Sequence, residues 1–302
     1  MSLRSISPRS ISLHMKLLAT TAIAASAALL LAGCSSAGGA DATVRIGVVG
    51  ASDPYWATYE QAAADAGIAV KIIDFSDYNQ PNPALTEGEI DINQFQHIAY
   101  LAQYNASAGA DLVPIGTTAI YPLGLYSSKY KDVADIPAGS TIAIPNDTTN
   151  QTRALLVLQS AGLVQLKDGG TVLSNVDDVE PSSKVQVTAL EASLTPTSLP
   201  DVAAAVINND FIANAGLKAE DAIAQDDPND PSALLYANIF AARAADAQNE
   251  TYTKLVSIYQ DTQSVLDGVK EQSGGTAVFL KTPASDLERS LQSAEKAITA
   301  AS

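Results

Sequence analysis

The sequence contains few of the side chains that build disulfides, metal sites or catalytic triads. Among its 302 residues there is one cysteine, Cys34, and there are two histidines, His14 and His97. A single thiol cannot form an intrachain disulfide, so packing has to stabilise the fold. Two histidines are too few for the multi-histidine sites that bind zinc or manganese, so we expect no metal. Beyond the N-terminal region, His97 is the only base that a Ser-His-Asp triad could use.

Motifs typical of hydrolases and nucleotide-binding enzymes are absent as well. The sequence has no Gly-x-Ser-x-Gly elbow and no Walker motif, and the segment from Gly47 to Gly50 does not match Gly-x-Gly-x-x-Gly. We therefore expect no catalytic residues, no enzyme activity and no cofactor. An exported hydrolase with His97 as its base is the alternative, which a turnover assay on His97→Ala would test.

Basic residues are scarce relative to acidic ones. The chain carries 17 Lys and Arg against 33 Asp and Glu, a net charge of −16. Nucleic acids and anionic membrane surfaces attract proteins through basic patches, so this balance argues against both as partners. Hydrophobic residues make up 47% of a chain about as long as two typical domains, so we expect a folded core and not disorder.

No apolar run is long enough to cross a membrane. The run Leu17–Leu31 has 15 residues, whereas a spanning helix needs about 20. Lys16 precedes this run and small residues follow it, which is the layout of a secretory signal peptide. We predict a lipoprotein signal peptide over residues 1–33, with an alternative translation start at Met15, and a flexible tether over residues 34–42.

Cys34 ends the quartet Leu-Ala-Gly-Cys, which resembles a bacterial lipobox. The resemblance implies that this cysteine is lipidated and becomes the N-terminus after cleavage. We therefore expect an exported protein that is lipid-anchored to the cell membrane and faces the extracytoplasmic side. The alternative, a buried core thiol, has no core sequence around it. Cleavage before Cys34 would leave 14 basic and 33 acidic residues, a net charge of −19.

Strand-like and helix-like segments alternate along the rest of the chain, which predicts an α/β fold. The alternation begins afresh near residue 141, so we expect two lobes joined by two crossing segments. Lobe I is predicted to contain residues 43–122 and 238–302, and lobe II residues 123–237. The acidic loop 225–231 is predicted to be a solvated turn. The expected strands are 43–49, 68–74, 89–92, 111–115, 141–145, 185–190 and 202–207, the expected helices are 54–66, 95–108, 150–161, 246–267 and 284–300, and the expected extended segments are 118–127 and 234–242.

Polar and aromatic residues follow several of these strands, and in open α/β sheets ligands bind beyond the carboxyl ends of strands. Arg153 lies in the first turn of a predicted helix, where a ligand carboxylate could meet both the guanidinium and the helix dipole. A pair between Arg153 and a surface acid such as Asp147 is an equally good interpretation. Phe95 and Tyr100, taken alone, are typical of core residues, and Asn150 alone is typical of a turn or a helix cap.

A set of motifs downstream of the tether keeps a distinctive order and spacing. The segments are Phe75–Tyr78, Pro81–Leu85, Gly88–Asn93, Phe95–His97, Tyr100–Leu101, Tyr121–Pro122, Ile144–Asp147, Thr149–Asn150, Arg153, Ala205–Asn208 and Tyr236–Asn238. Together they resemble the NlpA family of methionine-binding lipoproteins. The resemblance covers essentially the whole chain after the tether, and its most specific parts are Phe-Gln-His and Pro-Asn-Asp.

The resemblance implies a type II periplasmic-binding-protein fold, in which a ligand lies between two α/β lobes and is delivered to the permease and ATPase of an ABC importer. The expected ligand is methionine, in its L or D form. The aromatic residues and the histidine would enclose the ligand's apolar side chain, the arginine would bind its carboxylate with an asparagine nearby, and the two later asparagines would bind its amine. The implied ligand-binding residues are Tyr78, Phe95, His97, Tyr100, Asn150, Arg153, Asn208 and Asn238.

Two segments differ from many members of this family. Thr148 stands where many relatives have proline, and Asn209–Phe211 stands where relatives have small hydroxyl residues. A methionine-containing dipeptide or another amino acid is therefore an alternative ligand. The alternative from another class of function is a surface interaction lipoprotein that keeps the fold without transport.

Overall fold

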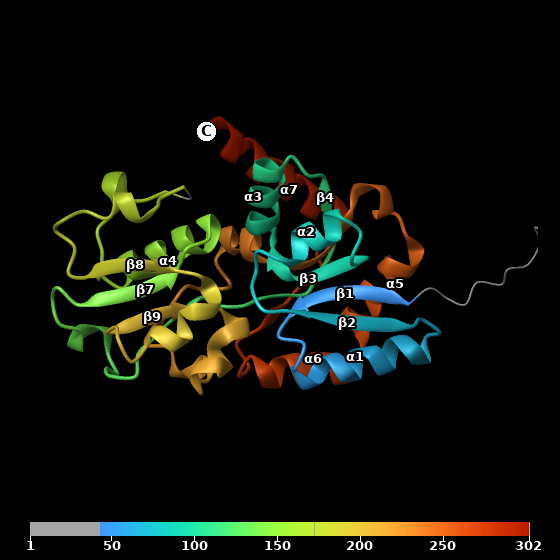
Figure 1. Cartoon of the computed structure of the whole chain (residues 1–302), viewed down its shortest axis with the longest axis horizontal. Helices are drawn as coiled ribbons and strands as arrows, with labels where there is room; N and C mark the ends of the chain where they lie inside the picture. Colours follow the sequence, from blue (N-terminus) through green and yellow to red (C-terminus); the bar gives the residue numbers. More distant parts are fainter. Residues whose placement is uncertain (1–42, 172, 302) are drawn as a thin grey trace, which may run out of the picture. The chain divides into compact units, whose positions relative to one another are not determined.

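A five-stranded mixed sheet forms the first lobe, in the order β2-β1-β3-β11-β4 (Figure 1). In this computed structural model, residues 43–171 and 173–301 are described, so the predicted signal peptide, the tether and Cys34 lie outside the described residues. Strand β1 runs parallel to β2 and β3, whereas β11 runs antiparallel to β3 and β4. The strands are β1 (Val44–Val49), β2 (Val70–Phe75), β3 (Ile92–His97), β4 (Leu112–Thr117) and β11 (Asn238–Arg243).

A second five-stranded sheet, in the order β10-β6-β9-β7-β8, forms the second lobe. Strand β7 is parallel to β8 and β9, and β6 is antiparallel to β9 and β10. The two mixed α/β lobes match the expected fold class. The strands are β6 (Gly124–Tyr126), β7 (Thr141–Pro145), β8 (Gln186–Leu190), β9 (Ala204–Ile207) and β10 (Ala224–Gln225), and a separate ladder joins β5 (Ala119–Ile120) to β12 (Val278–Phe279).

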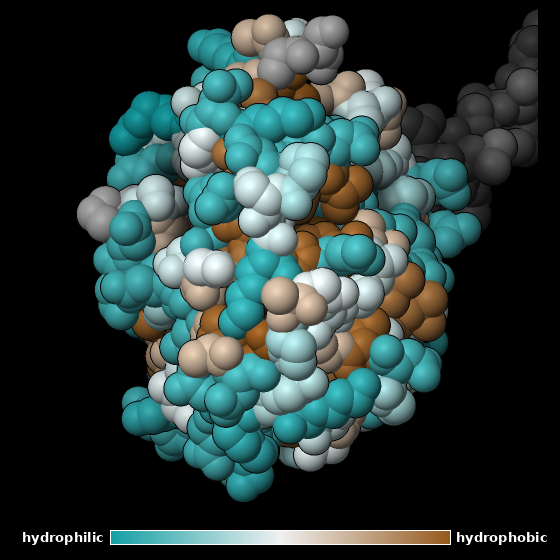
Figure 2. Space-filling view, turned by 90° about the vertical axis from the view of Figure 1, so that its left-hand side faces the viewer, coloured by the Kyte–Doolittle hydropathy of each residue, from teal (hydrophilic) through white to brown (hydrophobic). Residues whose placement is uncertain are grey.

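Helices cover the faces of both sheets (Figure 1). The C-terminal helices return to the first lobe, where α6 packs on α1 and α7 packs on α3 and β4. On the face of the second lobe that Figure 2 presents, hydrophilic residues dominate, with apolar residues between them, as the acidic composition leads one to expect. The helices are α1 (Pro54–Asp65), α2 (Pro81–Thr86), α3 (Ile98–Ala108), α4 (Thr148–Ser160), α5 (Glu250–Asp261), α6 (Gln263–Gln272) and α7 (Ala284–Ala301).

The third strand corrects the sequence-based expectation of a strand at 89–92 and a helix from 95. Strand β3 begins at Ile92 and continues to His97, and every one of its residues is buried. Two of its polar side chains, Asn93 and Gln96, are tolerated there because they bond to Asn82 of α2. The Asn82 Oδ1 accepts from Asn93 Nδ2 at 2.9 Å and from Gln96 Nε2, and Asn82 Nδ2 donates to Gln96 Oε1 at 2.7 Å. This network lets an apparently polar segment form a central strand.

Two further boundaries differ from the expected ones. The segment expected to be extended from 234 is instead a 3-10 helix over Pro231–Tyr236, because Asp230 caps it by accepting from the Ser232 amide at 2.8 Å. The helix expected over 246–267 is divided at Thr262, whose extended backbone separates α5 from α6.

Candidate functional site

A narrow cavity with a volume of about 30 Å³ lies between the strand ends of the two lobes. All eight residues that the sequence analysis expected to bind a ligand line it: Tyr78, Phe95, His97, Tyr100, Asn150, Arg153, Asn208 and Asn238. Six further lining residues were not expected: Gln96, Tyr121, Pro122, Leu123, Asn209 and Asp210. The fold thus brings residues up to 160 positions apart in the sequence to one place.

One wall of the cavity is aromatic. Tyr78 follows β2, Phe95 lies on β3 and Tyr100 lies in the first turn of α3. The ring centroids of Tyr78 and Phe95 are 5.8 Å apart, and those of Phe95 and Tyr100 are 5.7 Å apart, edge to face. Tyr100 Oη donates to the Tyr78 carbonyl at 2.9 Å, which fixes its ring. Such a wall suits an apolar or polarizable ligand group.

A chain of hydrogen bonds connects His97 to both lobes. His97 is the N-cap of α3, where its Nδ1 accepts from the Tyr100 amide at 3.1 Å. Its Nε2 therefore carries the proton and donates to Asn150 Oδ1, 3.3 Å away. Asn208 Nδ2 donates to the same oxygen at 3.0 Å. The Asn208 Oδ1 atom is buried and has no hydrogen-bond partner among the described residues, so a donor from a ligand would satisfy it.

The environment of His97 keeps its imidazole neutral. Burial, assisted by the positive charge of Arg153, lowers the pKa of His97 to about 3. A group with so low a pKa is a weak base near neutral pH, which argues against the hydrolase alternative. His97 serves instead as a fixed donor to Asn150.

The low pKa of His97 makes a prediction about acid stability. In the unfolded chain His97 takes up a proton near pH 6.5, whereas in the folded chain it does so only near pH 3. Lowering the pH through this window therefore favours the unfolded state, by at most about 1.4 kcal/mol per pH unit. We expect His97→Gln to lose less stability than the wild type between neutral pH and about pH 4 in urea unfolding. Parallel pH profiles for the two proteins would contradict this prediction.

Arg153 is the sixth residue of α4 and lies in its second turn, not in the first turn as expected, because the helix begins at Thr148 after the N-cap Asp147. The arginine is 5% exposed, and its guanidinium lies 4.3 Å from the centroid of the Tyr236 ring. Nε donates to Asp226 Oδ2 at 2.6 Å, and Nη2 donates to the Tyr121 carbonyl at 2.8 Å and to Asp226 Oδ1 at 3.2 Å. Within the described part of the chain, Nη1 has no such partner. The alternative of a pair with a surface acid is therefore confirmed in kind, although the acid is the partly exposed Asp226 and not Asp147.

The position of Asp226 corrects the expectation that the loop 225–231 is only a solvated turn. Gln225 of β10 lies opposite Gly124 of β6, and one residue further along the same ladder Asp226 lies opposite Leu123. The Asp226 carboxylate accepts from the Leu123 amide at 2.8 Å and remains 26% exposed. Strand register therefore carries this acid to Arg153, and the sequence contains no local signal of it.

Asp210 is the acidic lining residue that we did not expect from the sequence. It follows β9 two residues after Asn208, so the rule that selected Asn208 from the strand end could have selected it too. Its Oδ2 accepts from Tyr78 Oη at 2.8 Å, a hydrogen bond between the two lobes. Burial raises the pKa of Asp210 to about 6.

Asn238 completes the site from the second crossing segment. It begins β11, where it lies opposite His97 in the antiparallel ladder.

Among residues 43–171 and 173–301, no group of three or more His, Cys, Asp or Glu side chains could hold a metal ion. None of the helices formed by these residues is both long and apolar enough for a membrane span.

Comparison with known proteins identifies the group to which this architecture belongs. The family model described as NlpA lipoprotein matches residues 44–279. The D-methionine-binding lipoprotein MetQ of Yersinia pestis is 37% identical over 256 residues, which cover 83% of this chain and 93% of the relative.

Two solved structures add the three-dimensional comparison. A nutrient-binding protein from Burkholderia cenocepacia bound to methionine is 38% identical with a TM-score of 0.73, covering 78% of this chain and 99% of that one. The substrate-binding protein of a methionine transporter from Streptococcus pneumoniae is 35% identical with a TM-score of 0.72, covering 79% and 95%. By family model, sequence identity and fold alike, the chain belongs to the NlpA lipoprotein family.

Proposed function

We propose that this protein is a substrate-binding protein that captures methionine between its lobes and delivers it to an ABC importer. The observation that carries the proposal is that one cavity holds a buried guanidinium and a buried asparagine oxygen, and that among the described residues neither Nη1 of the first nor Oδ1 of the second has a hydrogen-bond partner. These two groups complement the carboxylate and the ammonium of a free amino acid. The relatives named for methionine support the choice of amino acid.

In this proposal each lining residue has a role that its contacts suit. Arg153 Nη1 binds the ligand carboxylate, while Asn208 Oδ1 and the Asn238 side chain bind the ammonium. Asn150 holds Asn208 and His97 in place through its Oδ1 atom. The aromatic wall contacts the thioether, because polarizable sulfur packs well against ring edges.

We also propose that the protein is anchored to the membrane beside the importer that it serves. An exported chain lipidated at Cys34 would stay close to the importer's permease and ATPase, because a tether raises the local concentration near the membrane. The names of relatives as lipoproteins and as part of a methionine transporter support this arrangement. We keep the lobe boundaries at 43–122 with 238–302 and at 123–237, in line with the division of the strands between the sheets.

Calorimetry on ligand-free protein tests the proposal. The delipidated chain is unfolded and refolded to remove carried ligand, then titrated with L-methionine, D-methionine, a methionine-containing dipeptide and leucine as a control. We expect heat from a methionine form and a dissociation constant in the micromolar range or below, about −8 kcal/mol or stronger. Binding of the dipeptide alone would redirect the proposal to that ligand. If no ligand binds, the surface interaction lipoprotein becomes the better hypothesis.

A further inference from the structure

The charges that line the cavity do not cancel. The positive charge of Arg153 already has a counter-ion in Asp226, at 2.6 Å, and His97 is neutral at physiological pH because its pKa is lowered to about 3. Asp210 is the remaining ionisable lining residue apart from the tyrosines. The ion pairs of residues 43–171 and 173–301 do not include Asp210. When Asp210 is ionised, the cavity therefore has a net negative charge.

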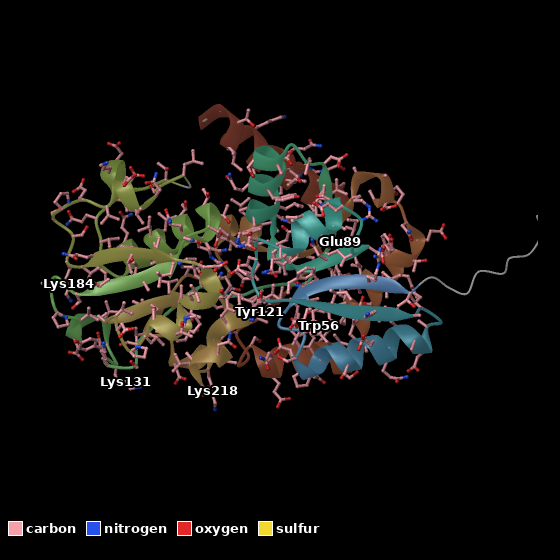
Figure 3. The ribbon with its side chains drawn as sticks, viewed as in Figure 1. Trp56, Glu89, Tyr121, Lys131, Lys184 and Lys218 are labelled. Atoms are coloured by element: carbon pink, nitrogen blue, oxygen red, sulfur yellow. The ribbon has the colours of Figure 1, made fainter. Side chains whose placement is uncertain are left out.

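Among the residues that the structure describes, burial and hydrogen bonds from Tyr78 and Asn209 act on Asp210, and no positively charged side chain does. Tyr78 Oη donates a hydrogen bond to it, but a neutral phenol does not compensate a charge. The labelled lysines of the second lobe lie on its outer side in Figure 3, away from Tyr121 at the centre. The titratable groups that interact with Asp210 electrostatically are Asp53 and Tyr55 at the start of α1, Tyr78 after β2, Tyr121 in the first crossing segment and Tyr259 on α5.

We propose that Asp210 is a specificity-determining residue, which makes the cavity select ligands that carry a positive charge. The inference rests on the proposed function and deepens it, because the positive group is then the free ammonium of the amino acid. Asn208 Oδ1 supplies an acceptor for that ammonium. Because Asp226 already neutralises Arg153, Asp210 supplies the net negative charge that attracts the ammonium. A carboxylate ligand that lacks the ammonium would contact the same arginine, but its negative charge would be repelled by the net negative charge of the cavity.

Ligand binding should release protons if Asp210 attracts the ammonium. With its pKa raised to about 6, Asp210 is partly protonated in the empty cavity at pH 6, and a bound cation favours the ionised form and lowers that pKa. Binding at pH 6 then releases protons, and affinity rises from pH 5 to neutral pH. Two other groups could release protons as well: Asp53, whose pKa burial and then Asp210 raise to about 7, and Asp147, whose pKa burial raises.

Two methionine analogues separate the charges of the ligand. Methioninamide keeps the ammonium and lacks the carboxylate, whereas methylthiobutyrate keeps the carboxylate and lacks the ammonium. We expect Asp210→Asn to weaken methionine and methioninamide about 10- to 100-fold, the usual range for a lost charge-assisted hydrogen bond. Methylthiobutyrate should bind the variant as well as, or better than, the wild type. Asp227→Asn, which removes one exposed carboxylate from the same lobe, is the matched control and should change none of the three.

The outcomes distinguish this inference from the proposed function. If the wild type binds methionine but Asp210→Asn weakens all three ligands by the same factor, Asp210 has only a structural role and the inference is wrong. If the wild type binds no methionine, the proposed function fails and the inference fails with it. If Asp210→Asn does not fold, the wild type and Asp53→Asn can be compared instead. Calorimetry at pH 6 in buffers of different ionisation enthalpy measures how many protons each protein releases when it binds methionine. Proton release in both proteins supports the inference, and its absence from either overturns it.

Discussion

Arg153→Ala should lose most of the affinity for methionine. Truncating one member of a buried, hydrogen-bonded charge pair costs about 2 to 5 kcal/mol, and here the change would leave the ligand carboxylate buried without its cation. Only Nη1 of the guanidinium is open, since Nε and Nη2 bond to Asp226 and to the Tyr121 carbonyl. We therefore expect calorimetry to give a dissociation constant higher by a factor of about 30 or more.

The matched control for Arg153→Ala is Asp226→Asn. Both changes break the same ion pair, but only the first removes the Nη1 atom that is proposed to bind the ligand. Methioninamide sharpens the comparison, because it has no carboxylate and so does not need Nη1. It should bind Arg153→Ala, which leaves the charge of Asp226 uncompensated, at least as well as it binds Asp226→Asn. An affinity of Arg153→Ala for methionine close to that of the wild type would mean that another group binds the carboxylate. Equal losses in the two variants would assign the effect to the ion pair.

Elements with a continuous apolar pattern could be predicted from the sequence. The strand Thr141–Pro145 has the bounds that the sequence predicted, because four of its five residues are buried and its apolar run is uninterrupted. The third strand could not be predicted in this way. Asn93 and Gln96 look like loop or helix-cap residues until Asn82, more than ten positions earlier, supplies their hydrogen bonds. Tertiary contacts decide the structure of such a segment, and local propensity does not.

The residues of the candidate site also differ in how well the sequence predicts them. Motif order and strand ends brought eight lining residues together in the sequence analysis, and the cavity contains all eight. Asp226 and Asp210 were not predicted. Asp226 reaches Arg153 through the register of β10 on β6, and the Leu123 amide that it accepts from lies about a hundred positions away in the sequence. Asp210 follows β9 and could have been selected from the strand end, but its hydrogen bond to Tyr78 of the other lobe could not be predicted locally.

The amide network around Asn82 carries the second large effect. Asn82 is 1% exposed and makes three hydrogen bonds to Asn93 and Gln96 of β3. Asn82→Ala would leave these two buried amides short of partners, and each unsatisfied buried polar group costs about 1 to 3 kcal/mol. We expect the free energy of unfolding to fall by about 3 to 5 kcal/mol, measured by urea denaturation monitored by circular dichroism.

The same change should also weaken ligand binding, although Asn82 does not line the cavity. Strand β3 places Phe95 and His97 in the cavity wall, so water that enters to solvate Asn93 and Gln96 would loosen both. Asn229→Ala, at an exposed asparagine of the second lobe, is the control and should change stability by no more than about 0.5 kcal/mol. A loss below about 1 kcal/mol in Asn82→Ala would mean that ordered water already satisfies these amides. Normal methionine affinity in a clearly destabilised variant would mean instead that the network stabilises the first lobe without positioning the site.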